Sequence, residues 1–180
     1  ALGLTIVIQM AGAGLVGLKF VRHLAGGEDR ETYLHKNVTL YAPVPWINAH
    51  LTSADYLFIG ERQLFYFLDV PFLFASPFTQ SAVDIRPEQA DAARLHRQLC
   101  AAGLTHVLLR RIEPDTPGYT PPAMDALSRT PLLVRLQSFE ARTVGLRTLP
   151  GGGERAVLDI YRVESCRPAD RAAAARTGSM

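Results

Sequence analysis

Cysteine and lysine are both scarce in this chain of 180 residues, and neither sign of charge dominates. Two cysteines, Cys100 and Cys166, are too few for a disulfide-rich scaffold. Only Lys19 and Lys36 are lysines among 19 basic residues, and 17 acidic residues leave a net charge of +2. No basic field therefore supports nucleic-acid binding. Apolar residues make up 48% of the chain, which excludes a disordered protein and allows one domain with a substantial core.

The usual signatures of metal and nucleophile chemistry are also missing from the sequence. Among five histidines, no pair has the H-x3-H spacing of metal ligands, and neither cysteine has a C-x2-C partner. There is no G-x-S-x-G nucleophile motif and no P-loop. We therefore expect no metal site and no cofactor. We interpret Cys100 as a small buried apolar residue on a helix.

The first 18 residues contain no charge, and at 1.5 Å per residue a helix of this length covers roughly 27 Å. Lys19 and Arg22 follow the run directly, whereas a secretory signal would have its charges before the apolar stretch. The pattern predicts that residues 1–25 are the end of a transmembrane helix and its flank, belonging to a longer protein. The lipid bilayer is then an expected partner.

Two other interpretations of this segment remain open. Gly12, Gly14 and Gly17 match the G-x-G-x-x-G turn that brings backbone amides to the pyrophosphate of a dinucleotide. That motif needs a second strand ending in an acidic residue about 20 positions later, and residues 28–36 instead resemble a helix start. The segment could also be a buried apolar helix of a soluble protein.

Residues 26–166 are predicted to form a small α/β domain, in which helices flank a mixed β-sheet. A helix is expected after Gly27, with Leu34, Val38 and Tyr41 on one face until Pro43 and Pro45 interrupt it. A short turn is expected at residues 46–51. Residues 56–60 and 65–70 are predicted strands, and residues 71–84 an irregular loop.

The second half of the domain has the clearest pattern. A helix is predicted from Pro87 to Gly103, where glycine suits a left-handed C-terminal residue. The strand expected at 105–110 should run parallel to 56–60, because a helix connects them. Another helix is expected after Pro122, interrupted at Pro131 and resumed to Phe139. Residues 143–148 and 156–163 are predicted to form an antiparallel hairpin at the sheet edge, and 167–180 a disordered tail.

Charged residues follow two of the predicted parallel strands. Ligands of open α/β sheets bind beyond the carboxyl ends of such strands, so these residues could face one crevice. The candidate ligand-binding residues are Glu61, Arg62, Arg110, Arg111, Glu113 and Asp115. The alternative is that they are solvated loop charges or weak surface ion pairs.

The order of several segments resembles the C-terminal part of bacterial GT-C membrane glycosyltransferases, of the family-39 and aminoarabinose-transferase-like type. The resemblance covers residues 1–163 and consists of a spacing pattern. After the apolar start, it includes residues 26–34, 46–51, 54–62, 65–66 and 99–109.

This resemblance implies a membrane helix followed by a small α/β domain on the extracytoplasmic side of the bacterial inner membrane. Partners would be an upstream transmembrane bundle of the same protein and a polyprenyl-phosphate-linked sugar. The family's catalytic acid lies in an earlier external loop, so no catalytic residue is expected in this segment. Lys19, Arg22, Arg30 and Lys36 would instead favour a cytoplasmic flank, although that rule is weaker for a whole translocated domain. The other open interpretation is a membrane-anchored module that binds a glycan, a lipid or a protein without catalysis.

Overall fold

The computed structural model describes residues 26–27, 29–76, 80–86, 88–111, 121–143 and 155–166. In these ranges, no helix has both the length and the apolar character needed to cross a bilayer. The predicted membrane helix end at 1–25, the Gly12–Gly17 turn and the predicted tail at 167–180 lie outside the described residues.

The chain divides into two compact units, Ala1–Asn37 and Val38–Met180. The described part of the first unit includes helix α2 (Arg30–Asn37). Its start is fixed by Asp29, whose carboxylate accepts from the backbone N–H of Thr32 at 3.0 Å. The predicted domain boundaries at 25 and 166 border residues outside the described part and stay predictions.

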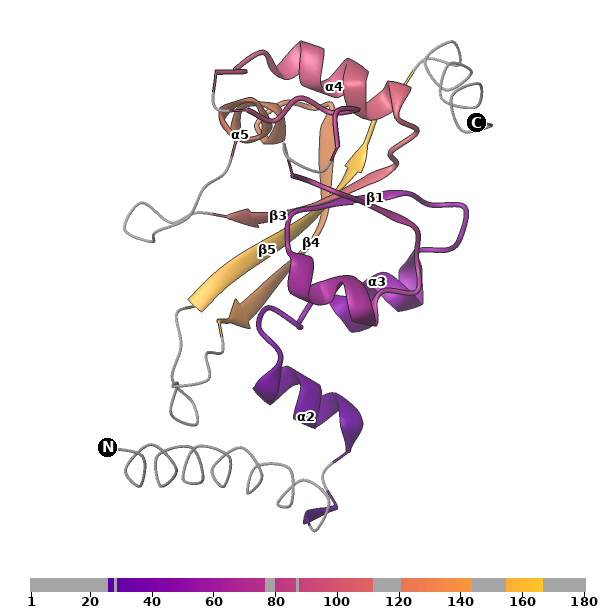
Figure 1. The fold of residues 1–180 in the computed structure, drawn as a ribbon, viewed down its shortest axis with the longest axis vertical. Helices are drawn as coiled ribbons and strands as arrows, with labels where there is room; N and C mark the ends of the chain where they lie inside the picture. The colour runs from indigo at the N-terminus through magenta and orange to yellow at the C-terminus, as the bar shows by residue number, and fades with distance from the viewer. Residues whose placement is uncertain are drawn as a thin grey trace, which may run out of the picture. The chain divides into compact units, whose positions relative to one another are not determined.

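The second unit is built on one five-stranded mixed sheet in the order β2-β1-β3-β5-β4 (Figure 1). The parallel part contains β1 (Leu57–Ile59), which lies between β2 (Phe72–Phe74) and β3 (His106–Arg111). The antiparallel part contains β5 (Arg155–Val163), which lies between β3 and the edge strand β4 (Leu133–Arg142). The predicted α/β class and mixed sheet are therefore confirmed.

Helices cover both faces of this sheet (Figure 1). Helices α4 (Ala92–Ala101) and α5 (Pro122–Ser128) pack on one face. Helix α3 (Val44–His50) lies on the other face, and its Asn48 donates to the carbonyl of Phe67 in the 3-10 helix η1 (Arg62–Phe67). Buried side chains therefore form a layer on either side of the sheet. The α4–α5 layer includes Phe58, Leu95, Leu99, Val107, Met124, Leu127 and Tyr161.

The β–α–β unit matches its prediction. Helix α4 ends before Gly103, which has a φ of 74°, a conformation that glycine adopts without strain. Strand β3 then pairs in parallel with β1, with Phe58 opposite Val107. The start of the helix differs, because Asp91 caps it by accepting from the N–H of Arg94 at 3.0 Å. The helix therefore begins at Ala92, and Pro87 lies outside the described residues.

The predicted strand at 65–70 is wrong. Residues 62–67 form the helix η1, in which Leu64 is fully buried while Tyr66 is 91% exposed. The second strand is instead β2, inside the predicted irregular loop. An aromatic cluster connects these two elements. The ring of Phe65 stacks on that of Phe72 with 4.5 Å between the ring centroids, and it contacts Phe74 edge-on with 5.0 Å between the centroids.

The helix expected to resume after Pro131 is also wrong, because residues 133–142 form the strand β4. This strand is the antiparallel partner of β5, so the predicted edge hairpin is correct in kind but not in its first strand. Residues 144–154, which include most of the predicted partner strand, lie outside the described residues.

The first predicted helix is shorter than expected. It ends at Asn37, and it could not have continued to Tyr41 because Leu40 has a φ of 61°, which a right-handed helix cannot contain. Pro45 does not interrupt a helix but lies in the first turn of α3, where its missing N–H costs nothing.

Candidate functional site

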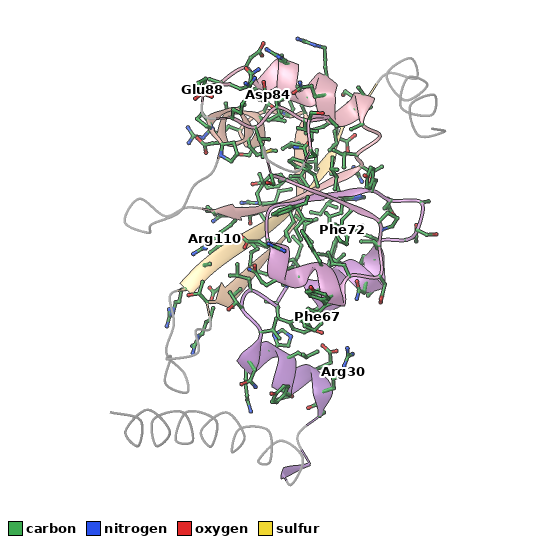
Figure 2. All side chains as sticks on the ribbon, in the orientation of Figure 1. Arg30, Phe67, Phe72, Asp84, Glu88 and Arg110 are labelled. Carbon is green, nitrogen blue, oxygen red and sulfur yellow. A yellow bond between two sulfur atoms is a disulfide. The ribbon has the colours of Figure 1, made fainter. Side chains whose placement is uncertain are left out.

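The structure separates the predicted crevice residues into two groups. Arg110 and Arg111 end β3 and line a pocket of about 700 Å³, and Figure 2 shows Arg110 near the carboxyl end of that strand. Glu61 and Arg62 are not among the lining residues, because the chain turns into η1 after β1 and Glu61 accepts from Gln63 at 2.9 Å. Glu113 and Asp115 lie outside the described residues. Of the six predicted crevice residues, Arg110 and Arg111 therefore lie at a pocket, and a ligand-binding role for them stays a prediction.

Three elements form this pocket, which we call the β3–α5 pocket. The end of β3 contributes Leu109, Arg110 and Arg111. Strand β5 contributes Asp159 and Tyr161, and helix α5 with its C-cap contributes Pro122, Asp125, Ser128 and Arg129. Leu109 pairs with Asp159 in the antiparallel register, so these two side chains point to the same face of the sheet.

Asp159 is the unexpected member of the pocket, because it is a carboxylate that is only 2% exposed in the middle of an apolar strand. Arg111 donates to its Oδ2 twice, from Nε at 3.1 Å and from Nη2 at 2.7 Å. The hydroxyl of Ser138 on β4 donates to Oδ1. The hydroxyl of Tyr161 approaches Oδ2 at 3.4 Å. A buried carboxylate needs such partners, and here three strands supply them.

Burial raises the pKa of the Tyr161 phenol, and the negative charge of Asp159 raises this pKa further. The phenol therefore stays protonated and keeps its O–H available as a donor at neutral pH. Tyr161 is thus a fixed, uncharged polar group in the pocket wall, with its ring buried in the core.

The opposite wall is the outer side of α5. Ala123, Met124 and Leu127 are buried in the core, which leaves Asp125 and Arg129 toward solvent. Arg129 donates from Nη2 to Oδ2 of Asp125 at 2.8 Å, four residues earlier. The hydroxyl of Ser128 donates to the carbonyl of Asp125 at 2.8 Å and keeps its lone pairs as acceptors.

Chemically, this arrangement suits binding more than catalysis. The bonds from Arg111, Ser138 and Tyr161 already occupy Asp159, so its carboxylate is not a free base in the described structure. Asp159 instead fixes the guanidinium of Arg111, whose side chain is 45% exposed. Asp159 was not among the predicted site residues, although an acidic residue within the apolar run AVLDIYRV is a visible signal.

A second cluster joins α4 to the segment after β5, and it corrects our interpretation of Cys100. Cys100 is buried as expected, but it forms a disulfide with Cys166, 66 residues later. His96 lies beside this bond, with Nε2 at 3.6 Å from the Cys100 sulfur and at 2.7 Å from the carbonyl oxygen of Glu164. The potential ligand atoms of His96, Cys100 and Cys166 lie within 4.8 Å of one another. This group could bind a metal ion only with the cysteines reduced, because the thiolate is the metal-ligating form.

Comparison of this chain with protein-family models, with curated proteins and with solved structures finds no match. The family resemblance described above therefore stays an expectation.

Proposed function

We propose that this chain is the accessory domain, on the extracytoplasmic side, of a bacterial inner-membrane glycosyltransferase that uses a polyprenyl-phosphate-linked sugar. The domain itself performs no chemistry in this proposal. It works together with an upstream transmembrane bundle that contains the catalytic acid, and residues 1–25 are the connection to that bundle.

The observation that supports this placement most is the Cys100–Cys166 disulfide. Disulfides persist in oxidising compartments such as the bacterial periplasm and are rare in the cytosol. This bond ties helix α4 to the segment that follows β5, so it belongs to the fold of the domain. The charges after the apolar run favour the opposite side, and the disulfide is the stronger argument because it concerns the domain directly.

A labelling experiment tests the placement. Ser53 is exposed, so Ser53→Cys supplies a reporter thiol, while the two native cysteines are protected by their bond. In intact cells, a membrane-impermeant maleimide should label the Ser53→Cys protein and leave the unsubstituted protein unlabelled. Labelling of Ser53→Cys only after the cells are lysed would place the domain in the cytoplasm and overturn the proposal.

A transfer assay tests the activity. Membranes that contain the complete gene product should transfer sugar from a polyprenyl-phosphate donor, and the 180-residue chain alone should not. Transfer by the chain alone would contradict an accessory role. If the complete product transfers no sugar, the alternative of a non-catalytic binding module is favoured, and the β3–α5 pocket is the feature that supports that alternative.

A further inference from the structure

We infer that the β3–α5 pocket is a binding site for a neutral sugar ring, held by the exposed N–H groups of Arg111 and Arg129 and by acceptor atoms of Asp125 and Ser128. This inference goes beyond the proposed function, because it assigns a ligand class to one pocket of the sheet domain. It holds whether or not a transferase is attached.

Charge balance is the first argument. Arg111 is paired with Asp159 and Arg129 with Asp125, so the side chains that form these two walls are neutral as a set. Arg110 also borders the pocket, but alternation along β3 assigns its side chain to the face of the sheet opposite to that of Arg111. A phosphate site is expected to contain cationic donors without a neighbouring carboxylate. The two paired arginines here do not meet that description, so an uncharged ligand fits these walls better.

The mixture of donors and acceptors is the second argument. A guanidinium has five N–H donors, and Arg111 gives two to Asp159 and therefore keeps three. Asp125 keeps Oδ1 beside the bond from Arg129, and Ser128 keeps the lone pairs of its hydroxyl. A sugar hydroxyl is both donor and acceptor, so neighbouring hydroxyls on one ring match this alternating set.

Rigidity and size complete the case. Both Asp159 oxygens are hydrogen-bonded to residues of other strands, so the Arg111 side chain is already fixed before a ligand binds. Binding therefore costs less conformational entropy of this side chain. Leu109 and Pro122 supply apolar lining for the C–H face of a sugar. The volume of about 700 Å³ falls within the usual range of small-ligand pockets, which is roughly 300–1,000 Å³.

Nuclear magnetic resonance of the 180-residue chain tests this inference. The probes are the methyl glycosides of glucose, galactose and mannose, with inorganic phosphate and glucose 1-phosphate as charged probes. We expect at least one glycoside to shift the amide signals of Leu109, Ser128 and Tyr161 in a saturable manner at millimolar concentration. No shift by any of the three glycosides, or shifts by phosphate and glucose 1-phosphate alone, would overturn the neutral-sugar site.

Variants then test whether the named atoms bind the sugar. Asp125→Ala and Ser128→Ala remove acceptors from the outer side of α5, where neither side chain is part of the core. Asp125→Ala should weaken binding about tenfold, the effect of losing one hydrogen bond to a charged group. Arg94→Ala is the matched control, because Arg94 is a charged residue on α4 that is not among the lining residues. Equal affinity of Asp125→Ala and Arg94→Ala would contradict the site, whatever the transfer assay shows.

Discussion

Arg111 and Asp159 are diagonal neighbours across the β3–β5 pair, and the arginine donates two hydrogen bonds to one oxygen of a carboxylate that is 2% exposed. The register places Leu109 opposite Asp159, and Arg111 opposite Val157. Ser138 holds the second oxygen from β4. One buried carboxylate therefore connects three strands and orients a guanidinium at the edge of a pocket.

Replacing Asp159 with alanine should lower the free energy of unfolding by about 2–3 kcal/mol, because Arg111, Ser138 and Tyr161 lose their shared acceptor. The loss is moderated because Arg111 is partly exposed and water can solvate it. Urea unfolding measures the change. The control is Asp125→Ala, which breaks the exposed pair with Arg129 and should cost less than about 1 kcal/mol. Equal losses in both variants would contradict a linking role for Asp159.

Removing the disulfide should have a larger effect. Cys166→Ser should lower the free energy of unfolding by about 2–5 kcal/mol, because the bond closes a loop with a sequence separation of 66. Urea unfolding with and without dithiothreitol checks this. The reductant should destabilise the native chain by a similar amount and leave Cys166→Ser unchanged. A native chain that is insensitive to reductant would mean that the bond is absent in solution.

The sequence predicts the centre of this fold better than its edge. The strand at Leu57–Ile59, the glycine that ends α4 and the parallel return through β3 follow from short apolar runs and one glycine. These signals are local, and burial on both faces of the sheet makes them strong. The strand β5 was equally visible, because residues 156–163 are a long β-favouring run, but its pairing with β3 was not predicted.

Strand β4 was not predictable in the same way. Its register shifts between Arg135 and Gln137, so a β-bulge interrupts the alternation of its side chains. Leu133 pairs with Val163 and belongs to the α4–α5 layer. Phe139, beyond the bulge, instead contacts Trp46 of α3 on the other face of the sheet, with 6.2 Å between the ring centroids. The resulting spacing of three between Leu133, Leu136 and Phe139 resembles a helix.

The candidate site was predictable only in part. Arg110 and Arg111 follow from the rule that ligands bind at the carboxyl ends of parallel strands. Asp159 lies at the same pocket because β5 pairs antiparallel with β3, and α5 lies there because it packs on the sheet. Both are far from Arg111 in the sequence, so no local pattern predicts that they meet. The disulfide was also not predictable from the sequence, because two cysteines 66 residues apart show no spacing that indicates a pair.

Acid should destabilise the domain through His106. Burial lowers the pKa of this imidazole, nearby Arg162 adds to the effect, and Asp55 opposes it. In the folded state, the ring therefore binds a proton at lower pH than in the unfolded chain, where the pKa is about 6.5. Below about pH 6.5 the unfolded state binds more protons, so the stability falls as the pH decreases.

The measurement is the free energy of unfolding of the native chain and of His106→Gln, at about pH 7 and about pH 5. The native chain should lose more stability between these values than the variant does. Glutamine can keep a hydrogen bond to Thr105, whose hydroxyl lies 2.9 Å from Nδ1 of His106. Parallel losses in the two proteins would assign the acid sensitivity to other groups.

Alkali should destabilise the domain through Tyr161, so this contribution to the stability falls as the pH increases instead of as it decreases. Its pKa is raised above the usual value of about 10 by burial and by the charge of Asp159. Above about pH 10, the unfolded chain releases this proton while the folded chain retains it, so the stability falls as the pH increases. A titration of tyrosinate absorbance in the folded protein should contain one late phase that is absent in Tyr161→Phe. Tyr66→Phe is the matched control, since this ring is 91% exposed, and it should keep the late phase. Loss of the late phase in Tyr66→Phe, and not in Tyr161→Phe, would show that Tyr161 is not the tyrosine with the raised pKa.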